Sequence, residues 1–349
     1  MPFTRRDFTK AAVSGIALAQ VAHLSQLAQA AQSVATAPPP PTHRVKWSYM
    51  DHWTMRSPRG WVTPQMAPRY ADRFYKAIVG VGYKGVDCFD FRLNQMIQMF
   101  GSAKAALQFA QDRGVERFPT VFGNGGNERP DLPETHDAVV KSFEDKIKLY
   151  EGVDIDNFVV MPGPRYWLVE PVTDEKLKRL ADCWNRVGRV TAEHGIKLSC
   201  HHEFYCCVHT RAEIDKFYEY ADPRYVGLWI DTAQHTIAGI DPTDLYVQYH
   251  DRVRGFHFKD THYVDTRGDY RTPPDPERVA STTYRWFWEM GTPEGLVDFP
   301  KLMKALKDFH YTGWLTVEID KADIGGANYA DSACKSKWYI DNVLSKIYA

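Results

Sequence analysis

The sequence predicts an α/β protein, a closed (β/α)8 barrel of the TIM-barrel type that forms a single domain. Short apolar runs of strand length alternate with longer segments of helical periodicity, eight times in the same order. The chain has 349 residues, a normal length for one such barrel with insertions, and no composition break divides it. Several apolar runs end in His, Asp or Glu, and the carboxyl ends of barrel strands are where this fold carries out chemistry.

The predicted strands are runs rich in β-branched and aromatic residues. They cover residues 45–49, 84–89, 117–122, 157–161, 196–203, 226–231, 253–260 and 313–318. The segments between them have helical periodicity over residues 64–79, 92–113, 133–150, 174–194, 211–220 and 300–309, with a short helix opening at Asp241 and a last one closing near Ser345. Gly195 after the long helix, and Asp241 followed by Pro242, are typical helix caps.

One connection is much longer than the others. Residues 261–297 follow the seventh strand and contain four prolines and an aromatic run from Tyr284 to Trp288. Connections of this length in a compact domain are usually functional or act as lids. A doubly wound open sheet is the alternative fold, but it normally has a glycine-rich phosphate turn after the first strand, and residues 48–53 lack one.

The first 30 residues are interpreted as a targeting segment. Arg5 and Arg6 precede an apolar stretch at 11–19, and small residues at 28–30 suit a cleavage site, a pattern typical of a Tat export signal. The apolar stretch is too short and too rich in alanine for a stable membrane anchor. Residues 31–43 form an alanine- and proline-rich leader, and the barrel occupies 44–349. We therefore expect the Tat machinery to export a folded protein to the periplasm.

Composition argues against several classes of function. The formal net charge is −1, and no basic face typical of nucleic-acid-binding proteins is evident. The ten Trp and nineteen Tyr suit a sugar-sized pocket, but also a packed core. None of the six cysteines forms a CxxC pair, which argues against a thiolate zinc site. The expected destination would allow a disulfide, but we expect all six to be buried as small apolar residues.

Four predicted strands end in side chains that bind divalent cations. His201 and Glu203 end the fifth strand, Asp231 the sixth, His257 the seventh and Glu318 the eighth. His201 and Glu203 face the same way, because side chains alternate along a strand. A mixed set of nitrogen and oxygen ligands suits Mn²⁺, Co²⁺, Mg²⁺ or Zn²⁺. A single His, Asp or Glu at a strand end is more often a structural group. The prediction of a metal site therefore rests on all four strands ending in such residues.

These motifs resemble those of the xylose-isomerase-like TIM barrels, which include sugar isomerases, ketose 3-epimerases, inosose dehydratases and related lyases. The resemblance rests on residues 195–204, 227–242, 255–260, 295–300 and 313–318, and the N-terminal half shares only the rhythm of strands and helices. It implies one divalent ion, with Mn²⁺ favoured, bound by Asp231, His257, Glu318 and a residue of the fifth strand.

The resemblance leaves the roles in the fifth strand open. By register His201 takes the ligand position and Glu203 is then an acid or base, but Glu203 as the ligand is the alternative. Related barrels often have a histidine three residues after the aspartate of the sixth strand. This chain has Gln234 there, followed by His235, for which a packing or surface role is expected.

The implied chemistry is proton abstraction beside a metal-bound carbonyl of a sugar, keto-sugar, keto-glycoside or cyclitol. Epimerisation, isomerisation, or β-elimination and hydration can follow. Glu203, Lys259 and Glu318 are the candidate catalytic residues, with Lys259 either stabilising enolate charge or forming an ion pair. The candidate substrate contacts at the barrel mouth are His52, Arg165, Trp167 and Arg267.

Two alternatives come from other classes of function. One is a non-catalytic periplasmic sugar-binding barrel. The other is a DNA-repair enzyme like endonuclease IV, which would need further histidine ligands and a basic DNA-binding face. The sequence leaves open which sugar and which metal are used and whether the chain forms a homo-oligomer.

Overall fold

A computed structural model describes the chain over residues 45–51, 56–57, 60–61, 63, 65–123, 128–266, 268, 286–320 and 329–348. The predicted export signal and leader, and the candidate substrate contacts His52 and Arg267, lie outside these residues, as does much of the insertion at 261–297. Among the described residues, no helix combines the length and the apolar character that crossing a membrane requires.

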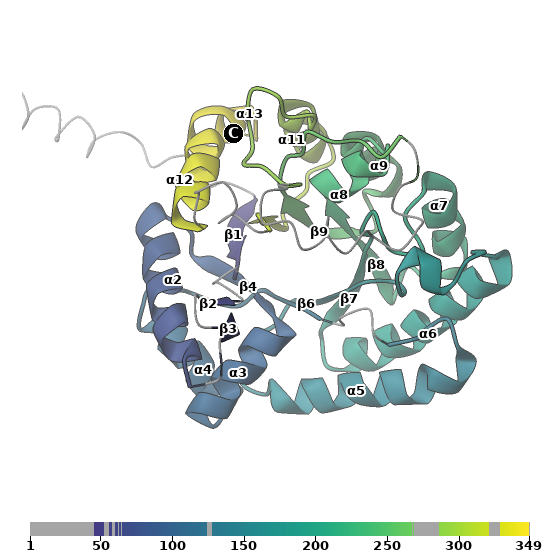
Figure 1. The fold of residues 1–349 in the computed structure, drawn as a ribbon, viewed down its shortest axis with the longest axis horizontal. Coiled ribbons are helices and arrows are strands. Elements are labelled where there is room, and N and C mark those ends of the chain that lie inside the picture. The colour runs from purple at the N-terminus through teal and green to yellow at the C-terminus, as the bar shows by residue number, and fades with distance from the viewer. Residues whose placement is uncertain are drawn as a thin grey trace, which may run out of the picture. The chain divides into compact units, whose positions relative to one another are not determined.

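Eight parallel strands form a closed barrel surrounded by helices, which confirms the predicted (β/α)8 fold (Figure 1). The barrel strands are β1 (Lys46–Met50), β4 (Gly85–Phe89), β5 (Thr120–Phe122), β6 (Asn157–Val160), β7 (Lys197–His201), β8 (Val226–Asp231), β9 (Val253–Phe258) and β10 (Trp314–Val317). Each pairs with the next along the chain, and β10 closes the barrel against β1. A short antiparallel pair, β2 (Arg56–Ser57) and β3 (Gly60–Trp61), follows β1.

The helices alternate with the strands as predicted. They are α2 (Ala67–Val81), α3 (Asp90–Phe100), α4 (Ala103–Gln111), α5 (His136–Leu149), α6 (Asp174–Glu193), α7 (Arg211–Tyr220), α8 (Thr232–Ile237), α9 (Pro242–Tyr249), α11 (Phe299–Asp308), α12 (Tyr329–Tyr339) and α13 (Ser345–Tyr348), with the 3-10 helices η1 (Pro133–Thr135) and η2 (Tyr166–Leu168) and the π-helix η5 (Ile340–Leu344). Asp241 caps α9 through the amides of Thr243 and Asp244, with Pro242 at the first position, as its sequence predicts.

Several predicted boundaries are wrong. The helix predicted over 92–113 is two helices, because Gly101 takes a left-handed φ of 84° and Ser102 caps α4 by accepting from the Ala105 amide. Strands β7 and β9 end at His201 and Phe258, short of the predicted residues 203 and 260. The helix α8, directly after β8, was not predicted.

Buried apolar side chains fill the space between the barrel and its helices, and the barrel interior is packed in turn. Gly255 makes room there for the indole of Trp229, since a Cβ at this position would lie 1.9 Å from the ring. All six cysteines are free thiols. Five are buried as expected, but that expectation is wrong for Cys334, which is exposed on α12.

Candidate active site

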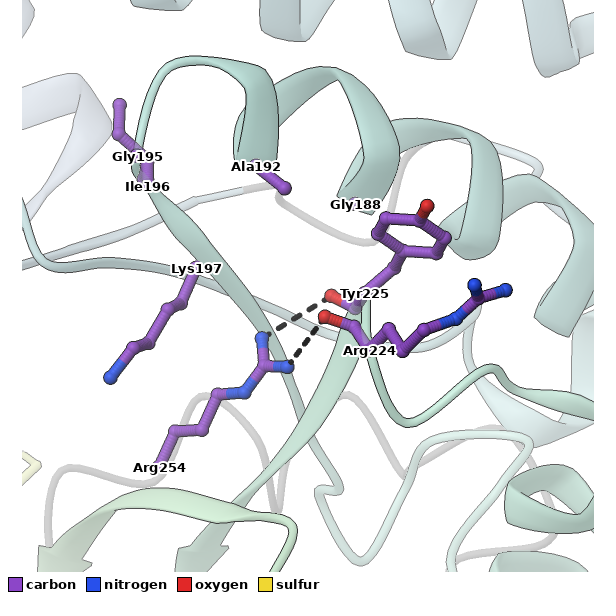
Figure 2. Close-up of a pocket in the computed structure, with 8 residues that line it drawn as sticks. All are labelled: Gly188, Ala192, Gly195, Ile196, Lys197, Arg224, Tyr225 and Arg254. Atoms are coloured by element: carbon purple, nitrogen blue, oxygen red, sulfur yellow. Dashed lines mark hydrogen bonds between the residues drawn. The ribbon is translucent and has the colours of Figure 1, made fainter.

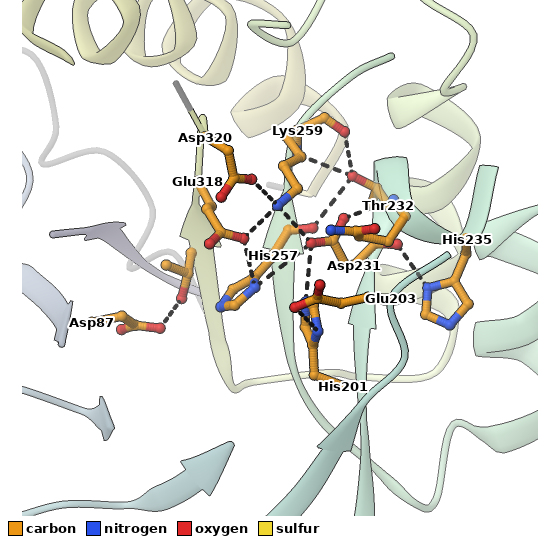
Figure 3. A network of polar contacts seen from close by, with 12 residues as sticks. Asp87, His201, Glu203, Asp231, Thr232, His235, His257, Lys259, Glu318 and Asp320 are labelled. Atoms are coloured by element: carbon orange, nitrogen blue, oxygen red, sulfur yellow. Dashed lines mark hydrogen bonds and ion pairs between the residues drawn. The ribbon is translucent and has the colours of Figure 1, made fainter. Parts of the chain in front are cut away.

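Four side chains converge at the carboxyl ends of four adjacent strands (Figure 3). His201, Asp231, His257 and Glu318 are all buried, and each offers one ligand atom within 4.8 Å of the others. Two ligand atoms bound to one ion at about 2.1–2.2 Å can lie at most about 4.4 Å apart. The 4.8 Å spread exceeds this limit slightly, so the four side chains must draw together to hold a single ion.

The distances within this group place Asp231 at its centre. Its Oδ2 lies 3.1 Å from His201 Nε2 and 3.7 Å from His257 Nδ1, while Glu318 Oε2 lies 2.8 Å from His257 Nδ1. The other carboxylate oxygen, Oδ1, caps α8 by accepting from the amide of Gln234 at 3.0 Å. The helix cap thus fixes the carboxylate so that Oδ2 faces the two imidazoles.

The donor set fits a divalent cation of borderline or hard character. Two imidazole nitrogens and two carboxylate oxygens suit Zn²⁺, Mn²⁺ or Co²⁺. Among the described residues, His257 Nε2 has no hydrogen-bond partner, while His257 Nδ1 and His201 Nδ1 contact the carboxylates of Glu318 and Glu203 as ion pairs. A buried nitrogen without a hydrogen-bond partner is costly, and coordination of a cation would give His257 Nε2 a partner.

The charges of the group depend strongly on one another. Burial lowers the pKa of His201 and acts in the same direction on His257, but Glu318 and Asp231 together raise the pKa of His257 to about 9. Burial alone would raise the pKa of Asp231, yet Lys259 and His201 hold it far below its usual value. Asp231 is therefore ionised throughout the physiological range.

Lys259 lies among the carboxylates of the site. Its Nζ is 2.6 Å from Glu318 Oε2, 2.7 Å from Asp320 Oδ2 and 2.9 Å from Asp231 Oδ2, and the residue is 1% exposed. Burial would lower the pKa of Lys259, but Asp231, Asp320 and Glu318 raise it well above its usual value. Three carboxylates around one ammonium leave two negative charges, which matches a divalent cation.

Glu203 stands beside the four-residue group. Its Oε1 lies 3.7 Å from His201 Nδ1, and burial raises the pKa of Glu203 well above its usual value. The loop that carries it is held on both sides: the amide of Phe204 donates to Gln234 Oε1 at 3.2 Å, and His202 Nδ1 donates to the carbonyl of Val208 at 2.9 Å. His201 rather than Glu203 belongs to the convergent set.

The remaining predicted residues lie elsewhere. Arg165 packs over the ring of Trp167 at 5.9 Å and forms a backbone bridge with Cys206, so the described contacts of this pair do not include the four-residue group. His235 is buried, and its Nδ1 donates to the backbone carbonyl of Asp231 at 2.7 Å. It has the packing role expected from the sequence.

The sequence motifs did not single out the role of Asp260 or the ring of Phe287. Asp260 Oδ1 accepts from the amides of Thr261 and Val297, and its backbone pairs with Trp288. These bonds tie the segment after residue 285 to the end of β9. The ring of Phe287 lies there, 4.4 Å from the Lys259 ammonium, so the segment contributes an apolar wall to the site.

A cavity of about 230 Å³ lies near the amino ends of β7, β8 and β9, at the other end of the barrel. Figure 2 shows the residues that line it: Gly188, Ala192, Gly195, Ile196, Lys197, Arg224, Tyr225 and Arg254. The guanidinium of Arg254 donates to four backbone carbonyls, among them those of Leu198 and Tyr225. Arg254 therefore stabilises the strand ends, and this cavity lacks the carboxylates and imidazoles of the opposite mouth.

Comparison with known proteins places these features in context. The family model described as "Xylose isomerase-like TIM barrel" matches residues 75–337. The chain is 31% identical over 173 residues to an inosose dehydratase of Lacticaseibacillus casei, covering 50% of this chain and 56% of that protein. It is 27% identical over 305 residues to an inosose dehydratase of Bacillus velezensis, covering 82% of this chain and 95% of that protein.

Solved structures share the fold at low sequence identity. A sugar phosphate isomerase/epimerase from Parabacteroides distasonis superposes with a TM-score of 0.66 at 16% identity, covering 88% of this chain and 97% of that one. The IOLI protein, solved with a bound zinc atom, superposes with a TM-score of 0.61 at 13% identity, covering 87% of this chain and 100% of that one.

Proposed function

The chain belongs to the xylose isomerase-like TIM barrel family, and on this basis we propose that it is a divalent-metal-dependent enzyme acting on a keto-cyclitol, keto-sugar or keto-glycoside. The proposed reaction is proton abstraction beside the carbonyl followed by β-elimination of water, as in a dehydratase. One observation carries the proposal: four ligand atoms from adjacent strand ends lie within 4.8 Å of one another. The similarity to inosose dehydratases supports elimination as the outcome.

His201, Asp231, His257 and Glu318 would hold the ion. When bound, the ion supplies Lewis-acid polarisation of the substrate carbonyl, which acidifies the neighbouring C–H bond. Mn²⁺ is our first choice, and Zn²⁺ is the second because the IOLI protein was solved with zinc.

Glu203 is the proposed acid and base. A divalent cation held nearby would lower the raised pKa of Glu203 and so favour its ionised form. In the proposed step the carboxylate of Glu203 takes the proton from the carbon next to the carbonyl, and the C–H electron pair forms the new C=C bond. The C–O bond at the β-carbon then breaks, and protonated Glu203 returns its proton to the departing hydroxyl, so that water leaves. The hydrogen bonds of Phe204 and His202 hold the loop of Glu203 in place for both transfers.

Lys259 is proposed to act as a counter-ion. Its ammonium has three N–H donors, and three protein carboxylates lie within 2.6–2.9 Å of Nζ. The contacts to Glu318 and Asp320 are hydrogen bonds, and the contact to Asp231 is an ion pair. Of the two roles expected for Lys259 from the sequence, the ion pair is the one that these contacts support.

Metal analysis combined with product analysis in heavy water tests the proposal. We expect natively purified protein to carry one divalent ion per chain and to convert a keto-cyclitol to a dehydrated product, with the activity lost on chelation and restored by Mn²⁺ or Zn²⁺. Deuterium in a product that has lost no water would instead identify an epimerase or isomerase. Sugar binding that is indifferent to chelation, without turnover, would contradict the enzyme and identify a binding protein.

We also propose that residues 1–30 direct export of the folded protein through the Tat machinery. The twin arginines are essential to such signals, so replacing Arg5 and Arg6 by Lys together is expected to leave the protein in the cytoplasm of a Tat-competent bacterium. Fractionation of cells that express each version, with detection of the protein in periplasm and cytoplasm, measures this. Equal export of both versions would contradict a Tat signal.

A further inference from the structure

A cluster of three polar side chains lies inside the barrel below the candidate metal site. Ser48 comes from β1, Asp87 from β4 and Thr316 from β10, and all three are fully buried. Ser48 Oγ lies 3.0 Å from Asp87 Oδ1 and 2.8 Å from Thr316 Oγ1, and Thr316 Oγ1 lies 2.6 Å from Asp87 Oδ2. The three groups thus form a closed ring of contacts at hydrogen-bond distance. Asp87, at the left of the network in Figure 3, marks its position.

The number of hydrogens in this ring depends on the protonation of Asp87. Each of the three contacts needs one hydrogen, and each hydroxyl has one. If Asp87 were ionised, two hydrogens would serve three contacts, and lone pairs would face each other across one of them. If Asp87 is protonated, every member donates once and accepts once. A hydroxyl from outside, such as that of Thr120 on β5, would add a donor to Asp87 but no hydrogen to the ring's own contacts.

We propose that Asp87 is a neutral carboxylic acid at neutral pH, and that its hydrogen-bonded ring with Ser48 and Thr316 makes it a positioning residue for Glu318. β1 lies between β4 and β10, so the ring joins three neighbouring strands at the seam where the barrel closes. Thr316 lies on β10, two residues before Glu318, which directly follows the strand, and both side chains are buried. The positioning role rests on the proposed metal-dependent function; the protonation state does not.

The surroundings of Asp87 act on its pKa in both directions. Burial raises its pKa, while the hydroxyls around it and His257 act in the opposite direction. The charged group that faces it is His257 on β9, and its described hydrogen bonds are to hydroxyls, with no lysine or arginine among them. A neutral Asp87 also leaves the site above with the two negative charges that suit a divalent ion.

Infrared spectroscopy of the metal-free protein tests the protonation state. The wild type is expected to show the carbonyl stretch of a protonated carboxyl at neutral pH, and Asp87→Asn should lose it. Glu203→Gln serves as the control for a second buried acid, since the Asp87 band must survive in it. If Asp87→Asn instead removes a carboxylate band, the proposal is overturned.

Ion binding tests the positioning role. Asp87→Asn keeps all three hydrogens of the ring, because its amide donates where the acid did, so divalent-ion affinity should stay within about threefold of wild type. Thr316→Val opens the ring and should weaken the affinity by about 10–100-fold, the usual loss when a group supporting a ligand is removed. Equal affinity in wild type and Thr316→Val would overturn the positioning role. Failure of the wild type itself to bind an ion would instead contradict the proposed function, and the infrared result would stand independently.

Discussion

Glu318→Gln is expected to abolish both ion binding and turnover, whereas Glu203→Gln should abolish turnover alone. Glu318 supplies a ligand oxygen to the convergent group, and an amide in its place loses the charge that attracts the cation. Glu203 lies beside the group as the proposed base, so its loss should lower kcat by about 10²–10⁴-fold, the usual contribution of general acid–base catalysis. Calorimetric titration with Mn²⁺ and steady-state kinetics on the two variants measure these effects.

The two variants also separate the roles that the sequence leaves open at the fifth strand. If Glu203 were the ligand in place of His201, Glu203→Gln would lose the ion together with the activity. His201→Ala is the matched variant and should behave like Glu318→Gln. An active Glu203→Gln enzyme that retains its ion would remove Glu203 from the mechanism.

The sequence predicts the positions of those site residues that end a buried strand, because strand periodicity marks where each strand lies. A run such as Val226–Asp231 marks a buried strand and places its terminal carboxylate at the mouth of a parallel barrel. Four such runs agree, so the proximity of Asp231, His257 and Glu318 follows from topology without knowledge of any loop. The strand ends themselves are less predictable, as the early end of β7 at His201 shows.

The residues that sequence reasoning missed act through contacts across the barrel. Asp320 lies two residues beyond the last strand-like position, and only the three-dimensional path of Lys259 brings its ammonium within 2.7 Å of that carboxylate. Asp87 lies on β4, and its ring partners Ser48 and Thr316 are 39 and 229 residues away from it in the sequence. Phe287 reaches the site through a segment without strand or helix periodicity.

Replacing Lys259 by Met is expected to destabilise the metal-free protein and to increase its stabilisation by a divalent ion. The ammonium is the counter-ion of Asp231, Glu318 and Asp320, and removing one partner of a buried charged pair typically costs about 3–5 kcal/mol. A bound divalent ion would then replace the missing positive charge, and it would no longer be repelled by the ammonium. Binding to the folded state alone raises the melting temperature, so the rise on adding Mn²⁺ should be larger in the variant than in the wild type.

The sign of this effect distinguishes a counter-ion from a catalytic donor. Lys259→Arg keeps the charge and should leave the ion-induced shift in melting temperature close to that of wild type. If Lys259 instead stabilised charge on the substrate, Lys259→Met would lower kcat while the ion-induced shift stayed unchanged. Thermal unfolding of both variants with and without Mn²⁺ measures the difference independently of any substrate. A smaller shift in Lys259→Met than in the wild type would mean that the ammonium organises Asp231 and Glu318 for the ion, and the charge-matching argument would fail.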